Sequence, residues 1–217
     1  MATAQPAGVE KVSGEDSMVA SSLIWWGGPA AILGGVLSFL VGVLSILGVL
    51  GNSYNSVMQA PLSAANYTLG IVGVMGIYLY LRRSGRFGLS GTVGFYMCVW
   101  ALLVLTILSL GDLLNVWGAR WYEALGLLWS PWVNLGLVLF GVAILRAGRL
   151  SRGGAWLLIA FSITEVGAIV AMAISGYTLG GWVWNVPSVV FGLGFVWLGY
   201  GLWSESGASA GRPSRVS

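Results

Sequence analysis

Six long apolar segments dominate the chain, with short links between them. The segments lie at about 23–51, 64–81, 92–110, 126–145, 155–174 and 183–203. Each has roughly the 20 residues that an α-helix needs to cross a hydrocarbon core about 30 Å thick. None alternates apolar and polar positions as the strands of a membrane barrel do. Because a backbone in lipid must satisfy its own hydrogen bonds, the pattern predicts an all-α integral membrane protein with a six-transmembrane-helix bundle.

The two ends of the chain differ from these segments. Residues 1–22 are small, polar and mixed in charge, and residues 204–217 are also polar. Segments of this composition bury too little apolar surface to fold by themselves. We expect a disordered cytoplasmic tail at 1–22, a six-helix transmembrane domain at 23–203 and a second disordered cytoplasmic tail at 204–217.

Composition excludes several classes of protein. Of the 217 residues, 57% are hydrophobic and 8% are charged, against roughly 25% charged residues in an ordinary soluble domain. Mean hydropathy is +0.87, so a water-soluble domain is excluded. The net charge of +3 is small, and the arginines form short separate groups, which opposes nucleic-acid binding.

The chain also lacks the residues of the common catalytic centres. It has no histidine, and Cys98 is its single cysteine. This removes bis-histidine haem, most catalytic zinc sites, His-based triads and disulfides. We therefore expect no cofactor, no metal and no enzymatic activity.

Arginine placement predicts the orientation. The links at 82–86 and 146–152, together with the C-terminal tail, hold every arginine except Arg120, whereas the links at 52–63 and 175–182 carry no charge. With six spans, all three arginine groups lie on one side, and retained arginine marks the cytoplasmic side. The prediction is a multi-pass protein of the cell membrane with both termini in the cytoplasm.

A shift of 63 residues brings similar positions into register. It aligns three Gly-Arg pairs that begin at Gly85, Gly148 and Gly211. It also aligns three further glycines, Gly28, Gly91 and Gly154. Two explanations remain open: three repeated helical hairpins, or glycine and arginine placed at helix ends by topology alone.

Small residues recur on single helix faces. In the first segment Gly34, Ser38 and Gly42 are four residues apart, and such faces let helix backbones approach closely in lipid. Tight packing within the chain is the favoured interpretation. A homo-oligomer or a membrane-protein partner is the alternative, and the lipid bilayer itself is the expected surrounding.

The main polar candidate inside the membrane is Glu165, near the middle of the fifth segment. A charge at that depth costs about 2.5–3.5 kcal/mol on insertion scales, so such a residue normally faces the bundle interior. Asn134 lies at a comparable depth in the fourth segment, and the other candidates are Ser162, Thr164 and Ser38. We expect Glu165 to be protonated or hydrogen-bonded to Asn134, either as a helix-locking contact or as a proton- or cation-coupled site.

A second candidate is the link at 111–125. Asp112, Arg120 and Glu123 are predicted at the outer surface, either as a small ligand- or partner-binding edge or as ordinary solvated charges. Leu113, Trp117, Trp121 and Leu125 recur every four residues in this link. That spacing suits an amphipathic helix on the membrane surface or an extension of the neighbouring spans.

These features together favour a non-enzymatic structural, accessory or regulatory membrane protein. A small transporter or channel that uses Glu165 and Asn134 is the alternative. A lipid-modifying intramembrane enzyme is a third class, and only the 112–123 segment offers the convergent polar groups it needs.

Overall fold

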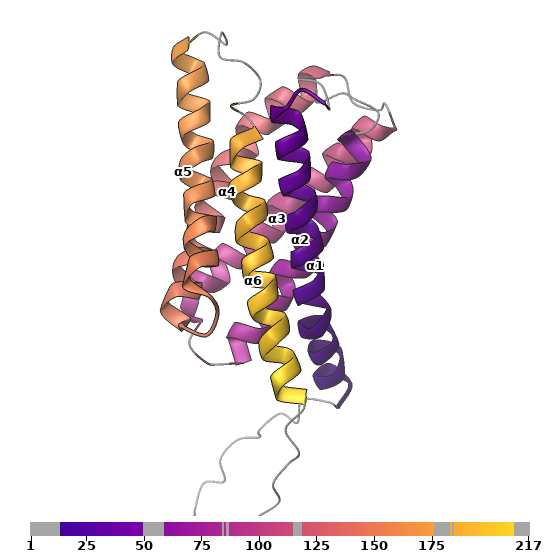
Figure 1. The fold of residues 1–217 in the computed structure, drawn as a ribbon, viewed down its shortest axis with the longest axis vertical. Coiled ribbons are helices and arrows are strands. Elements are labelled where there is room, and N and C mark those ends of the chain that lie inside the picture. The colour runs from indigo at the N-terminus through magenta and orange to yellow at the C-terminus, as the bar shows by residue number, and fades with distance from the viewer. Residues whose placement is uncertain are drawn as a thin grey trace, which may run out of the picture.

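The computed structural model describes residues 14–49, 59–83, 85, 87–114, 119–175, 183 and 185–210. Within these ranges the protein is entirely helical, as predicted, and contains no strand (Figure 1). The helices are α1 (Gly14–Ile46), α2 (Gln59–Arg83), α3 (Gly88–Leu113), α4 (Ala119–Ala147), α5 (Arg152–Ser175) and α6 (Val186–Ala210).

The six helices of the described chain form a closed ring. Each packs against its neighbours in chain order, and α1 closes the ring by packing extensively on α6. Short links make successive helices antiparallel. In addition α2 touches α6 across the ring, which draws the first and third hairpins together.

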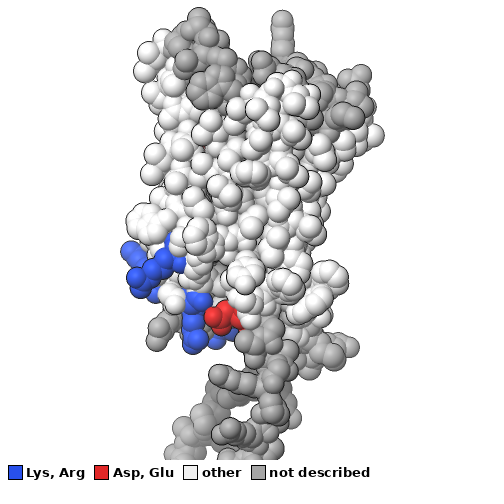
Figure 2. Space-filling view, in the orientation of Figure 1, with Lys and Arg blue, Asp and Glu red and all other residues white. Residues whose placement is uncertain are grey.

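Within the described ranges, five helices are long and apolar enough to cross a membrane. In α4 the described apolar stretch, Pro131–Ala147, is shorter. Large apolar side chains are exposed on the outer faces of the helices, and the middle of the wall shows no charge in the view of Figure 2. An exposed apolar surface of this extent is typical of contact with lipid. The fold is therefore consistent with a helical membrane bundle.

The helix ends differ from the predicted segments. α1 already begins at Gly14 and α6 continues to Ala210, so part of each expected tail extends a helix instead. α1 ends at Ile46, well before residue 51, because Gly48 adopts a left-handed φ of 74°. The amide of Val49 then donates to the carbonyl of Leu44 and that of Gly48 to Ser45, a Schellman motif that terminates the helix.

The 111–125 link is divided between two helices. α3 continues through Leu113, and α4 begins at Ala119. Extension of the neighbouring spans therefore accounts for the described part of this link better than a separate surface helix does. Residues 115–118 lie outside the described part of the chain.

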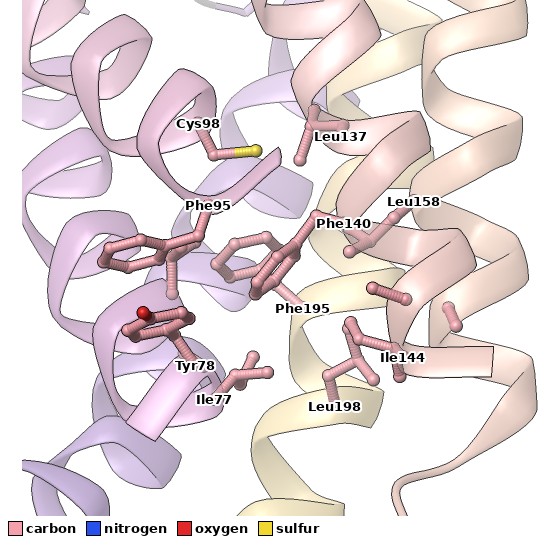
Figure 3. Close-up of a cluster of buried hydrophobic side chains, with 14 of the residues drawn as sticks. Ile77, Tyr78, Phe95, Cys98, Leu137, Phe140, Ile144, Leu158, Phe195 and Leu198 are labelled. Carbon is pink, nitrogen blue, oxygen red and sulfur yellow. The ribbon is translucent and has the colours of Figure 1, made fainter. Parts of the chain in front are cut away.

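Aromatic side chains fill the interior near the arginine-bearing end. Tyr78 stacks on Phe95 with ring centroids 3.9 Å apart, and Phe87 meets Phe140 edge to face. Phe195 from α6 fills the space beside Phe140 (Figure 3). Tyr78 is buried although it lies near the end of α2. The neighbouring rings provide enough apolar contact to hold it inside.

Glycines bring the helices into backbone contact. A Cβ atom at Gly192 of α6 would lie 2.5 Å from the carbonyl oxygen of Gly35 in α1, and one at Gly35 would lie 2.6 Å from that of Gly192. Gly27 and Gly76 pair similarly between α1 and α2. Such approach gives the dispersion contacts that hold helices together in lipid, where no hydrophobic drive acts between them.

We predict that Gly192→Ala lowers the thermal midpoint in detergent micelles, with a cost of about 1–3 kcal/mol for the forced separation of α1 and α6. Gly167→Ala is the matched control, because a Cβ there meets no described atom within 4 Å and alanine favours a helix. Circular dichroism during heating measures both variants. Equal midpoints for the two would show that the α1–α6 contact is not tight.

Candidate functional site

Asn134 and Ser162 join α4 to α5. Both residues are buried. The hydroxyl of Ser162 donates to the backbone oxygen of Asn134 at 3.2 Å and lies 3.5 Å from that of Leu158 in its own helix. A hydroxyl this deep in an apolar bundle is costly without such an acceptor, so the bond fixes the two helices relative to each other.

Ser38 joins α1 to α6 by a hydrogen bond of the same kind. It is buried in α1, and its hydroxyl donates to the backbone oxygen of Ser188 in α6 at 3.0 Å. The neighbouring Gly35 and Gly42 let α6 come close enough for this bond. The predicted small-residue face of α1 is thus a helix-packing surface.

Thr164 does not point its hydroxyl at another helix. Its Oγ1 donates to the backbone oxygen of Phe161, one turn earlier in α5, at 2.8 Å. Such an intrahelical bond satisfies a hydroxyl in an apolar helix. Thr164 therefore adds no polar group to a shared site through this hydroxyl.

Glu165 is half-buried and extends the inward face of α5. It follows Ala155, Leu158 and Ser162, all buried, at three- or four-residue spacing. At 1.5 Å per residue it lies about 20 Å from the start of α5, near the middle of the helix.

The packing register places Glu165 near the beginning of α6. Gly154 lies against Leu198, and Gly194 lies against Leu157. Following this antiparallel register outward brings Glu165 level with Val186, the first residue of α6. Beyond that level α5 extends past α6 (Figure 1). Glu165 therefore lies at the level where α6 begins. On one side of this level α5 has both α4 and α6 as neighbours, and α6 does not extend to the other side.

The predicted intramembrane residues do not converge as one group. Asn134 and Glu165 belong to the α4–α5 side, whereas Ser38 faces α6 from α1. The direct Glu165–Asn134 hydrogen bond stays a prediction. Across the described residues, no three His, Cys, Asp or Glu side chains gather to hold a metal ion. Chemically, the arrangement offers hydrogen bonds between helices and one carboxyl able to hold a proton.

The outer-surface candidates fall at the ends of two helices. Asp112 belongs to the last turn of α3, and Arg120 and Glu123 belong to the first turns of α4. Their side chains lie outside the described part of the structure. The predicted binding edge therefore stays a prediction.

One polar contact at the other end was not predicted. The hydroxyl of Tyr80 in α2 donates to Oε2 of Glu205 in α6 at 3.3 Å. The Arg82 guanidinium lies over the ring of Tyr78, 5.8 Å from its centroid. Tyr80 and Glu205 are 125 residues apart, so only the contact of α2 with α6 reveals the pair. From the sequence, the arginines predicted the orientation in the membrane but not their contacts with these tyrosines.

Comparison with protein-family models, curated proteins and solved structures yields no match to this chain. Its function is therefore inferred from its own residues and packing.

We predict that Ser38→Ala lowers the free energy of unfolding by about 0.5–1 kcal/mol, the usual value of a hydrogen bond between membrane helices. Titration of the micelle-bound protein with sodium dodecyl sulfate measures the change. Thr164→Val is the control, because it removes a hydroxyl whose bond stays within α5. A loss as large in the control would mean that the α1–α6 bond contributes nothing specific.

Proposed function

We propose that the chain is a non-enzymatic structural or accessory protein of the cell membrane. In this proposal it crosses the bilayer six times with both termini in the cytoplasm. Its role is to present a stable helical body in the membrane.

The observation that carries this proposal is the filled interior. Phe140, Phe195, Leu158 and Ile77 come from four helices and are fully buried, and their side chains cluster together in Figure 3. Among the polar candidates, Ser38 and Ser162 donate hydrogen bonds to neighbouring helices. Packing of this kind suits a fixed scaffold better than a solvated pathway.

The charge distribution supports the proposed orientation. The arginines with described side chains lie at the end of α2, at the end of α4, in the α4–α5 turn and at the start of α5, which are all at one end of the bundle (Figure 2). Arg120, in the first turn of α4, is the exception among the arginines of the described helices. The positive-inside rule assigns such an end to the cytoplasm. α1 begins and α6 ends on that same side.

We predict that Leu114→Cys reacts with a membrane-impermeant maleimide in sealed cells, whereas Ser84→Cys reacts only after the cells are opened. Leu114 is 72% exposed at the far end of α3. The unmodified chain is the background control, because its Cys98 is buried. Labelling of Ser84→Cys in sealed cells would show that the chain has the opposite orientation.

We further propose that the three hairpins are repeats. α2, α4 and α6 end at residues 83, 147 and 210, close to the 63-residue shift in the sequence. Gly85 and Gly148 both adopt a left-handed φ, and each is followed two residues later by a buried apolar side chain, Phe87 or Leu150. The two turns share these two features, which topology alone does not require, and they differ at Gly88, whose left-handed φ has no counterpart at Ser151.

Glu165 favours a second function, proton- or cation-coupled transport. A carboxyl half-buried near mid-span is costly and is therefore typical of ion pathways. The packing register also places it level with the start of α6, at the edge of the α5–α6 contact. Transport would require water to reach this carboxyl from both sides.

We predict that the purified protein in liposomes carries no proton flux above that of empty liposomes, measured with an internal pH-sensitive dye under an imposed potential. Glu165→Gln then changes stability but not flux. If the native protein does carry protons, Glu205→Gln is the control, because Glu205 is exposed. Flux abolished by Glu165→Gln but kept by Glu205→Gln would replace the structural proposal with the transport one.

A further inference from the structure

The turn between α4 and α5 holds three arginines in a fixed frame. Arg146, Arg149 and Arg152 are exposed at every third position. Between them, Leu150 is buried and lies 3.8 Å from the position of a Cβ on Gly201 of α6. The chain reverses at Gly148, which adopts a left-handed φ. The turn is thus anchored to α6, and the arginines point away from it.

The first turn of α5 strengthens this frame. The amide of Gly154 donates to the hydroxyl of Ser151 at 3.5 Å, as at a capped helix start. Arg152 is the first residue of the helix. The position of its backbone is therefore set by the helix rather than by a loose loop.

The positive charge around this turn is in excess. Arg82 and Arg83 end α2 on the same side of the bundle, and Arg149 lies near enough to Tyr80 to act on it electrostatically. Glu205 is the one carboxylate with a described side chain at this end, and it accepts a hydrogen bond from Tyr80 (Figure 2).

Two indole rings border the same helix start on the membrane side. Trp156 is 60% exposed and lies one turn after Arg152 on α5. Trp197 of α6 is 54% exposed, and its ring lies against Gly153, with Cζ2 3.2 Å from the position of a Cβ there. Exposed indoles next to arginines are typical of the headgroup level of a bilayer.

We propose that the α4–α5 turn binds the headgroup of an anionic phospholipid, with its phosphate between Arg149 and Arg152 and its glycerol region against Trp156 and Trp197. Guanidinium groups pair with phosphate oxygens through two parallel hydrogen bonds. Basic clusters between membrane helices on the cytoplasmic side bind such headgroups. The adjoining indoles and apolar wall select a lipid over a free phosphate. The inference rests on the membrane placement proposed above.

Lipid retention tests the proposal. The protein in neutral detergent is incubated with equal amounts of phosphatidylglycerol and phosphatidylcholine, washed on an affinity column and assayed for bound lipid by mass spectrometry. We expect at least a fivefold preference for phosphatidylglycerol. Arg149→Gln with Arg152→Gln removes most of this preference, whereas Arg82→Gln with Arg83→Gln, the same charge change at the other turn, alters it less than twofold.

Three outcomes would overturn the proposal. If the native protein shows no preference for phosphatidylglycerol over phosphatidylcholine, there is no such site. If both double variants lose this preference equally, the arginines attract anionic lipid through their overall charge and not through a defined site. Displacement of the lipid by millimolar glycerol phosphate shows that the arginines recognise free phosphate. Each variant is first shown to elute as a single species. Labelling of engineered cysteines as predicted above, combined with failure here, would leave the membrane placement intact.

The indoles allow a second, independent test. Trp156→Leu reduces retention of phosphatidylglycerol at least threefold, because the ring supports the glycerol region. Trp132→Leu is the matched control: Trp132 is equally exposed, at 60%, but lies near the middle of α4, well away from the α4–α5 turn. Equal retention by the native protein and Trp156→Leu would contradict the proposed pose.

Discussion

Close approach of helix backbones is the constraint on which the rest of the structure depends. In lipid, apolar side chains gain nothing by leaving their surroundings, so helices adhere through dispersion contacts and hydrogen bonds. Gly35 and Gly192 bring α1 and α6 into contact, and that contact closes the ring. Only at this separation does the hydroxyl of Ser38 reach the backbone oxygen of Ser188. Closure of the ring also brings α2 to α6 and thereby pairs Tyr80 with Glu205.

Polar side chains inside the bundle follow the same logic. A buried hydroxyl is costly without an acceptor, and for Ser38 and Ser162 the acceptor is a backbone oxygen of the neighbouring helix. Ser162 finds one on α4, and Thr164 turns back to its own helix. Hydroxyls satisfied in this way add specificity to helix pairing without forming a polar channel. Glu165 differs from them because its carboxyl can change charge, and it lies where α6 no longer flanks α5.

Much of this architecture was predictable because it depends on local composition. Segment length and hydropathy predicted the helices, and arginine placement predicted which links share an end. The contacts between distant helices were not predictable. Ser38 and Ser188 are 150 residues apart, and nothing in either segment indicates which other segment it packs against. Two helix ends were also predicted wrongly. α1 begins within the polar N-terminal segment, which hydropathy does not mark as a helix, and Gly48 ends α1 before the apolar segment ends. Burial of Tyr78 required knowledge of the facing Phe95.

The two ends of the molecule are built differently, and this asymmetry bears on what each can do. At the arginine end, buried anchors such as Phe87 and Leu150 tie the turns to the core, so the backbone that carries the arginines is held in place. Toward the other end α5 extends past α6, and Ile174 is 83% exposed. A rigid end suits recognition of a small charged group, because little backbone freedom remains to be lost on binding. A helix with neighbours along only part of its length has fewer contacts to hold it. Among the described residues, the outer end of α5 is therefore held by fewer neighbours than the arginine end is.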